Sequence, residues 1–203
     1  MSLRVTFLGT SGAVPTTQRA PSAVFVNREG DCLLFDCGEG TQRQMMRYGT
    51  GFAVSDIFVT HLHGDHILGI PGLIQSWDFN GRESPLTIHC PRGTASEIEG
   101  LVGVGDHTPT FSVDVSEIEA GGVALDSEEY VVRAVETDHR VPAVGYALIE
   151  DDRPGRFDRE KAEDELGVPP GPLYGKLHDG ESVELDDGRV IDPEQVVGEP
   201  RPG

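Results

Sequence analysis

Short apolar stretches separated by turn-forming residues fill the first 150 residues of the chain. Runs of about four to eight apolar-rich residues bounded by Gly, Pro or Asp predict β-strands. The predicted strands are LRVTFL (3–8), SAVFVN, CLLFDC, SDIFVT (55–60), LTIHCP, FSVDV, YVVRAVET and AVGYALIE. The turn-like sequence REGD joins SAVFVN to CLLFDC and therefore indicates a hairpin.

Two segments with helical spacing of apolar residues interrupt this series of strands. GTQRQMMRYG (40–49) predicts a short helix between glycines, and HILGIPGLIQSWDF predicts a second helix with Gly and Pro near its start. Strands mixed with helices in this way indicate a layered α/β fold and not an all-β barrel.

The pattern changes after about residue 151. Residues 151–180 are polar, contain Pro and Gly in close succession near the middle, and include one short acidic helix at about 158–166. This composition is typical of an inserted arm. The segment ESVELDDGRVID then predicts a hairpin with Asp-Gly in its turn. We therefore divide the chain into a core (1–150), a flexible arm (151–180) and a hairpin segment (181–203).

The chain is strongly acidic, with 35 acidic and 16 basic residues and a net charge of −19. The acids are dispersed along the sequence, so the charge is a property of the whole surface. At low ionic strength this charge would repel nucleic acid and destabilise the compact state. Molar salt shortens the screening length to about 3 Å and removes most of that repulsion. The composition therefore predicts adaptation to a salt-rich cytoplasm.

Features of secreted and membrane proteins are not expected. The longest apolar runs are too short for a membrane span, and the start MSLRVTFLGTSG does not have the pattern of a signal peptide. We interpret Cys32, Cys37 and Cys90 as buried, reduced thiols of a cytoplasmic protein. A metal or disulfide pair at Cys32 and Cys37 is the alternative.

The densest chemistry lies in FVTHLHGDHILGI (58–70), where four ligand-type side chains occur within six residues: His61, His63, Asp65 and His66. A strand end lets the side chains at 61 and 63 point the same way. Gly64 can adopt dihedral angles that bring Asp65 and His66 towards the same cavity. Imidazole nitrogens and carboxylate oxygens are typical ligands of Zn²⁺ and similar divalent ions. The turn therefore predicts a metal site, with two of these ligands on each of two neighbouring ions.

The sequence HLHGDH resembles the HxHxDH signature of the metallo-β-lactamase superfamily. Within that superfamily the chain resembles the ribonuclease Z family, which cuts transfer RNA at its 3′ end. The matching stretches are FLGTSGAVPT (7–16), LLFDCGEGTQRQ (33–44), IFVTHLHGDHILGIPGLI (57–74), ETDHRVPAVGYAL (136–148) and PPGPLYGKL (169–177). The resemblance implies a layered αββα sandwich with an exosite arm inserted in it.

The resemblance also implies roles for individual residues. His61, His63 and His139 would bind the first of two Zn²⁺ ions, and Asp65 and His66 the second. Asp65 would also orient or deprotonate the attacking water, which makes it the expected catalytic residue. Without the resemblance, His139 is a single histidine after a strand, and both ligand and non-ligand roles stay open for it.

Other polar residues near the motif have two interpretations each. Asp36 and Glu39 in FDCGEG are either outer groups that orient zinc-bound histidines or ordinary turn and helix-cap residues. Backbone amides of SGAVP (11–15) are expected to line the site. The remaining histidines are interpreted as a satisfied core residue (His89), a loop residue (His107) and a solvent-facing residue (His178).

The implied reaction is hydrolysis of one phosphodiester bond of precursor transfer RNA, which leaves a 3′-hydroxyl on the transfer RNA and a 5′-phosphate on the trailer. The arm would grip the elbow of the RNA, in a homodimer that serves the neighbouring subunit. The basic residues of the arm are Arg153, Arg156, Arg159, Lys161 and Lys176, which include both lysines of the chain. No membrane or DNA partner is expected.

The sequence departs from the family pattern at its end. A bridging carboxylate in a Gly-Asp-Thr context and a late histidine are required by that pattern, and neither follows His178 here. We therefore expect an N-terminal two-thirds of the fold with weak, partial zinc occupancy and little activity alone. Two alternatives remain, namely a small-molecule phosphodiesterase or arylsulfatase-like hydrolase, and a non-catalytic piece that binds RNA or dimerises.

Overall fold

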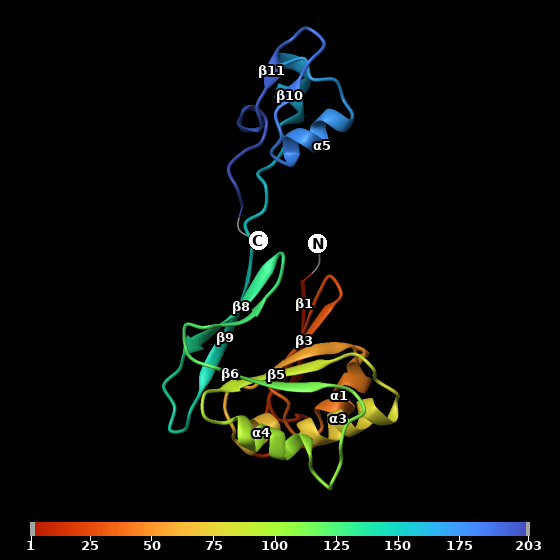
Figure 1. Cartoon of the computed structure of the whole chain (residues 1–203), viewed down its shortest axis with the longest axis vertical. Helices are drawn as coiled ribbons and strands as arrows, with labels where there is room; N and C mark the ends of the chain where they lie inside the picture. Colours follow the sequence, from red (N-terminus) through yellow and green to blue (C-terminus); the bar gives the residue numbers. More distant parts are fainter. Residues whose placement is uncertain (1–2, 202–203) are drawn as a thin grey trace. The chain divides into compact units, whose positions relative to one another are not determined.

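The computed structural model describes residues 3–201, which form two compact units (Figure 1). Unit 1 contains the residues up to Asp126 together with Val132–Leu148, and unit 2 contains Ser127–Val131 and the residues from Ile149 onward. Among the described residues, no helix combines the length and the apolar character that crossing a bilayer requires.

A six-stranded sheet forms the centre of unit 1. Its strands follow the order of the sequence: β1 (Leu3–Gly9), β2 (Ala23–Arg28), β3 (Asp31–Phe35), β4 (Val54–Phe58), β5 (Leu86–Pro91) and β6 (Val113–Ile118). The first three strands pair antiparallel, whereas β3 to β6 pair parallel. The hairpin predicted from REGD is confirmed, because β2 pairs with β3 through the register Arg28 to Asp31.

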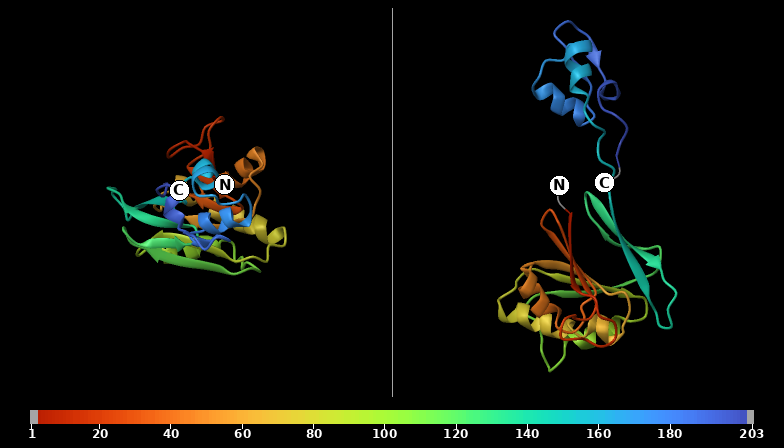
Figure 2. Two further views of the ribbon diagram at one scale, coloured as in Figure 1. Left: turned by 90° about the horizontal axis from the view of Figure 1, so that it is seen from above. Right: turned by 180° about the vertical axis from the view of Figure 1, so that it is seen from behind.

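Helices cover one face of this sheet (Figures 1 and 2). They are α1 (Thr41–Tyr48), α2 (Gly64–Ile67), α3 (Ile70–Phe79) and α4 (Ala95–Val102). Apolar side chains of α1 and α3 pack against alternate residues of β3, β4 and β5, such as Leu34, Ile57 and Ile88, which are all fully buried. The helices predicted at 40–49 and within HILGIPGLIQSWDF are confirmed, and α4 had no prediction.

A second sheet of three strands completes the layers: β7 (Val123–Asp126), β8 (Tyr130–Glu136) and β9 (Val144–Glu150). Tyr146 of β9 lies with its ring 5.3 Å from the ring of Phe58 and 6.1 Å from that of Phe35. These rings project from the face of the large sheet opposite the helix-covered one, because side chains alternate along a strand. The described residues thus contain one helix layer and both sheets of the expected αββα sandwich.

Unit 2 has a small apolar core of its own. It is built from a single-turn π-helix (Lys161–Glu165), α5 (Pro172–His178), the strand pair β10 (Val183–Glu184) and β11 (Val190–Ile191), and a 3₁₀ turn (Pro193–Gln195). The core residues are Ala162, Val168, Leu177, Val183, Leu185, Ile191 and Val196. Two backbone hydrogen bonds, of 2.7 and 2.9 Å, join Arg153 to Arg201. The elements of unit 2 lie on both sides of residue 180, the expected end of the arm.

Candidate metal centre

The candidate site lies where parallel strands of the large sheet end. Asp36 directly follows β3, and Thr60 and His61 follow the neighbouring parallel strand β4. Ligand sites of open α/β sheets form at the carboxyl ends of such strands, because the loops that leave them meet there. The buried strands thus provide a rigid edge from which the loop side chains project.

The HLHGDH turn is ordered by the one-turn helix α2. His63 precedes it with extended dihedral angles (φ −66°, ψ 146°), and Asp65 and His66 lie within it. Gly64 is its first residue and does not belong to the glycines with positive φ. The expected special conformation of Gly64 is therefore wrong, because helix geometry alone turns Asp65 and His66 towards the site.

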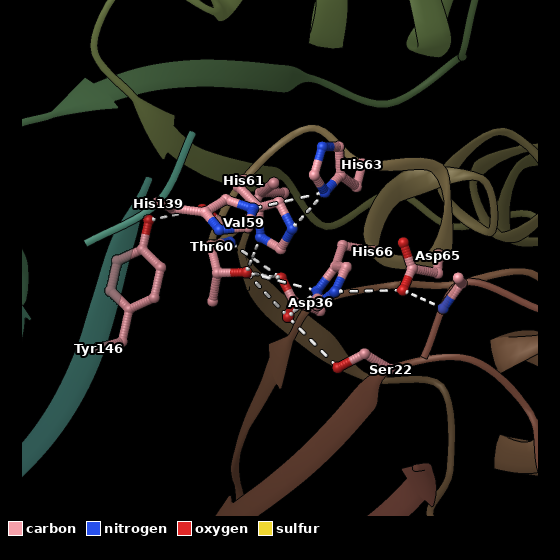
Figure 3. Close-up of polar contacts among 11 residues, drawn as sticks. Ser22, Asp36, Val59, Thr60, His61, His63, Asp65, His66, His139 and Tyr146 are labelled. Atoms are coloured by element: carbon pink, nitrogen blue, oxygen red, sulfur yellow. Dashed lines mark hydrogen bonds and ion pairs between the residues drawn. The ribbon is translucent and has the colours of Figure 1, made fainter. Parts of the chain in front are cut away.

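Nitrogens of His61, His63 and His139 converge on one point (Figure 3). The Nδ1 atom of His63 lies 3.1 Å from Nε2 of His61 and 3.4 Å from Nε2 of His139. Three nitrogens that share a tetrahedral zinc ion at 2.0–2.1 Å would be separated by roughly 3.3 Å. The donor type and the spacing therefore fit a divalent ion such as Zn²⁺.

His139 reaches this point from the loop between β8 and β9. The loop is fixed to the edge of the large sheet, because the N–H of Val144 donates to the carbonyl of Thr60 at 2.9 Å. An antiparallel bridge also pairs His61 with Ala143. Below it, the hydroxyl of Tyr146 donates to the carbonyl of Val59 at 3.1 Å. These contacts position a residue that is distant in sequence beside the HLHGDH turn.

Asp65 and His66 form a second, adjacent pair of donors. An Oδ2 atom of Asp65 lies 3.5 Å from Nε2 of His66. The same oxygen accepts a 2.6 Å hydrogen bond from the backbone N–H of Ala13. Backbone amides of SGAVP (11–15) were expected to line the site, and the N–H of Ala13 does so through this hydrogen bond. Together the two side chains could hold part of the shell of a second ion.

A buried carboxylate, Asp36, lies beneath both groups (Figure 3). It accepts hydrogen bonds from Nδ1 of His66 at 2.6 Å and from the N–H and hydroxyl of Thr60 at 2.8 and 2.9 Å. The Nε2 of His66 remains directed at Asp65. This is the geometry expected of an outer carboxylate that orients a metal-binding histidine.

The pKa shifts of His61 and Asp65 suit a cation site, whereas that of His66 favours its protonated ring when no metal is bound. Burial, with the neighbouring imidazole of His66, lowers the pKa of His61 to about 4, so its ring is neutral at pH 7. Burial also opposes the charged form of His66, but its hydrogen bond to Asp36 and the charge of that carboxylate outweigh burial and raise the pKa of His66. For Asp65, burial is outweighed by the N–H of Ala13, and its pKa is lowered.

The backbone of the FDCGEG segment lies directly against the backbone of α2 and of Gly69, which follows it. The N–H of Cys37 donates to the carbonyl of His66 at 2.7 Å, and the N–H of Gly69 donates to the carbonyl of Cys37 at 2.8 Å. A Cβ at Gly69 would lie 2.1 Å from the carbonyl oxygen of Gly38. Glycine is therefore required at 69, and the close approach holds His66 over Asp36.

An arginine-lined groove opens beside the site. A hollow of about 570 Å³ is lined by residues 15–21 and by α1 and its start, and its lining includes Arg19, Arg43 and Arg47. A second hollow of about 330 Å³ contains Ala13, His63 and Asp65. Both hollows are lined by Pro15, Pro21 and Glu39. The hollow with three arginines in its lining thus adjoins the hollow that contains His63 and Asp65, in a chain that is otherwise strongly acidic.

The other predicted residues have ordinary surroundings. His89 is buried, shares a 2.8 Å hydrogen bond between its Nε2 and Asp56 and stacks on Phe58, which confirms that it is a core residue. It is not fully satisfied, because its buried Nδ1 has no hydrogen-bond partner among the described residues. His107 lies in a loop, and His178 is exposed at the end of α5. The three cysteines are buried free thiols. Glu39 lines the two hollows instead of contacting a ligand histidine directly.

A model of the metallo-β-lactamase superfamily matches residues 16–192, which include all five candidate ligands. The chain belongs to the metallo-β-lactamase superfamily. Among superfamily members it is 68% identical over 203 residues to ribonuclease Z of Haloferax volcanii and 55% identical over 202 residues to that of Methanosarcina acetivorans. These matches cover 100% and 99% of the chain but 64% and 65% of the relatives, so the chain spans about two-thirds of their length.

A solved structure of the superfamily is similar to part of the chain. The human short-form tRNase Z is 35% identical, with a TM-score of 0.65, over 72% of this chain and 64% of that one. A diphosphatase of the PhnP family, 18% identical with a TM-score of 0.58, shares the fold. The expected superfamily fold is therefore confirmed.

Proposed function

We propose that the protein is a zinc-dependent endoribonuclease that removes the 3′ trailer from precursor transfer RNA. The observation that carries this proposal is the convergence of three histidine nitrogens beside Asp65 and His66, at the end of an arginine-lined groove. The high identity with proteins named ribonuclease Z supports the choice of this substrate over those of other superfamily hydrolases.

His61, His63 and His139 would hold one Zn²⁺ ion, and Asp65 and His66 would contribute to a second. When bound, such ions lower the pKa of a coordinated water to near neutrality and offset charge on phosphate oxygens. Among the described residues, the first set offers three donors and the second offers two. The first ion is therefore expected to bind more tightly than the second.

Asp65 is the proposed catalytic residue. Its lowered pKa keeps the carboxylate ionised, and the hydrogen bond from Ala13 fixes its Oδ2 atom. In this position it orients the attacking water and accepts its proton. The water oxygen forms a bond to phosphorus as the bond to the 3′ oxygen of the transfer RNA breaks, and the released oxygen takes a proton from bulk water. The products are a 3′-hydroxyl on the transfer RNA and a 5′-phosphate on the trailer.

The arginines of the groove would bind the phosphates next to the cleaved bond. Guanidinium groups bind phosphate oxygens through paired hydrogen bonds, and phosphate contacts position an RNA without reading its sequence. Arg43 and Arg47 lie one helical turn apart on α1, so both can follow one backbone. Selection would then depend on the shape of the acceptor region, as is usual for double-stranded RNA.

Unit 2 is the proposed exosite. A hollow of about 480 Å³ in it is lined by Arg156, Arg159 and Lys161, among other residues. Deleting 155–175 would remove the core residues Ala162 and Val168, so substitution is the sharper change. Replacing the three bases with glutamine should weaken cleavage of precursor transfer RNA and leave hydrolysis of a small chromogenic phosphodiester unchanged. Equal loss on both substrates would contradict the exosite role.

A homodimer is the proposed assembly. Met46 and Phe79 expose 67% and 92% of their surface beside a hollow of about 580 Å³, whose lining residues are all uncharged. A second copy could cover this face of α1 and α3 without bringing acidic groups together. Light scattering in molar KCl should give a dimer mass for the wild type and a monomer mass for Phe79→Asp. An unchanged dimer in the variant would exclude this face.

The decisive test of function is cleavage of a labelled precursor transfer RNA in high salt by the zinc-loaded protein. The expected result is a weak cut at one position next to the acceptor stem, with the products given above, and its loss in Asp65→Asn, whereas full turnover by this chain would contradict the low activity expected from the sequence. A matched control is Asp114→Asn, which changes a carboxylate on β6 away from the proposed site. Hydrolysis of small phosphodiesters without RNA cleavage would favour the alternative hydrolase. Binding of RNA without either reaction would favour a non-catalytic role.

The proposed reaction would take place in the cytoplasm, where the substrate is met. The three buried free thiols are typical of a reducing compartment and support this location.

A further inference from the structure

The hydroxyl group of Thr60 connects the two sets of candidate ligands. Its Oγ1 atom lies 3.0 Å from Nδ1 of His61 and 2.9 and 3.0 Å from the two carboxylate oxygens of Asp36 (Figure 3). It is also 3.4 Å from Nδ1 of His66. No other side chain drawn in Figure 3 contacts a histidine of each set together with the buried carboxylate.

The direction of these hydrogen bonds follows from Asp36. Four groups surround its carboxylate: the N–H and hydroxyl of Thr60, Nδ1 of His66 and the hydroxyl of Ser22. Each of them can carry a proton, whereas an ionised carboxylate only accepts. The single hydroxyl proton of Thr60 therefore points to Asp36. The lone pairs of its oxygen remain for His61, so Nδ1 of His61 must be the donor.

We propose that Thr60 is a positioning residue that holds His61 in the Nδ1–H tautomer and thereby directs the lone pair of Nε2 into the three-histidine pocket. The Nε2 atom is the one that lies 3.1 Å from Nδ1 of His63. In the other tautomer, Nε2 would carry a proton towards the pocket and could not bind a cation. The inference rests on the metal centre of the proposed function.

One buried carboxylate thus orders one ligand in each set. Asp36 holds His66 directly, at 2.6 Å, and holds His61 through the Thr60 hydroxyl. A change at Thr60 should therefore affect His61 and leave the tautomer of His66 unchanged. A change at Asp36 should affect both rings. This difference separates a hydrogen-bond relay from a general loosening of the turn.

The test uses two nearly isosteric variants of the untagged chain in molar KCl. Thr60→Val keeps the branched shape and removes the hydroxyl, whereas Thr60→Ser keeps the hydroxyl. Two-bond ¹H–¹⁵N correlation spectra of the metal-free protein report the tautomer of each histidine. We expect the Nδ1–H form of His61 in the wild type and Thr60→Ser, and a mixture or the Nε2–H form in Thr60→Val. Zinc affinity, measured by competition with a chelating dye, should fall about 10- to 100-fold in Thr60→Val, as is typical when an outer partner of a ligand is lost.

Thr94→Val is the matched control, because it removes the hydroxyl of another threonine, a buried one that donates to the carbonyl of Pro91 at 2.6 Å. It should leave His61 and the zinc affinity unchanged. If valine at position 60 prevents folding, Thr60→Ala gives the same comparison with Thr60→Ser.

Three results would overturn the inference: an unchanged His61 tautomer in Thr60→Val, a zinc affinity within about 2-fold of wild type despite a changed tautomer, or equal damage in Thr60→Ser. Because the tautomer is read without metal, a wild type that binds no zinc would refute the proposed metal centre separately.

Discussion

Replacing Asp36 with alanine should destabilise the metal-free protein by about 4 kcal/mol. Asp36 is only 5% exposed and has a φ of 57°, a left-handed conformation that Asp and Asn tolerate better than Ala. The bonds from the Thr60 N–H and from His66 are each worth about 1.5 kcal/mol, as bonds to a charged group. The left-handed alanine adds about 1 kcal/mol. This loss is large for a domain stable by about 5–15 kcal/mol.

Asp36→Asn separates the two contributions. Asparagine tolerates the left-handed conformation and keeps one oxygen for the N–H of Thr60, but it loses the charged bond to His66. The expected loss is therefore about 2 kcal/mol. Ser22→Ala removes only the 3.4 Å contact to Asp36 and serves as the control, with a loss below about 0.5 kcal/mol.

Urea unfolding followed by far-UV circular dichroism, in molar KCl with chelator, measures the free energy of unfolding for all three variants. A loss below about 1 kcal/mol for Asp36→Ala would refute the assignment of strong, buried hydrogen bonds to this carboxylate. Equal losses for alanine and asparagine would refute the backbone argument.

Three further predictions concern metal, pH and salt. His139→Ala should lower the affinity for the first zinc ion by about 100-fold or more, since one of three donors is lost, and equilibrium dialysis checks this. Because burial lowers the pKa of His61 from 6.5 to about 4, unfolded chains gain a proton that the folded protein does not. The free energy of unfolding should therefore fall as the pH drops from 6.5 to 4, and it should fall by less in His61→Asn. Urea titrations at several pH values measure this difference. The raised pKa of His66 has the opposite effect on stability: its contribution is present at low pH and is lost as the pH rises above about 6.5. Finally, the net charge of −19 predicts a melting temperature that rises steeply with KCl concentration, and a salt-independent value would contradict the halophilic interpretation.

Local patterns in the sequence predicted most of unit 1 and one side of the site. The apolar strands, the helices after Gly40 and Gly69, and the density of ligands in HLHGDH are all properties of neighbouring residues. His139 was identified only through the family resemblance. Its approach to His61 depends on the bridge to Ala143, a pairing between distant segments that no local pattern encodes.

Other features could not be predicted because their signals are shared with ordinary structure. Thr60 is β-branched at the end of a strand, where threonine is common without any role in a site. The left-handed conformation of Asp36 follows from its four donors, which come together only in the fold. The apolar core of unit 2 was not predicted, because its buried residues, such as Ala162, Val168 and Leu177, have irregular spacing in a polar segment.

The backbone pairing of Arg153 with Arg201 brings the two ends of most of unit 2 together. All seven residues of its apolar core lie between these two positions, and the backbones meet side by side at its base. Residues 154–200 therefore begin and end at neighbouring points of the backbone. Segments whose two ends are neighbours are readily inserted or exchanged as a unit. The sequence of the part proposed to bind RNA can therefore change independently of the sequence of unit 1.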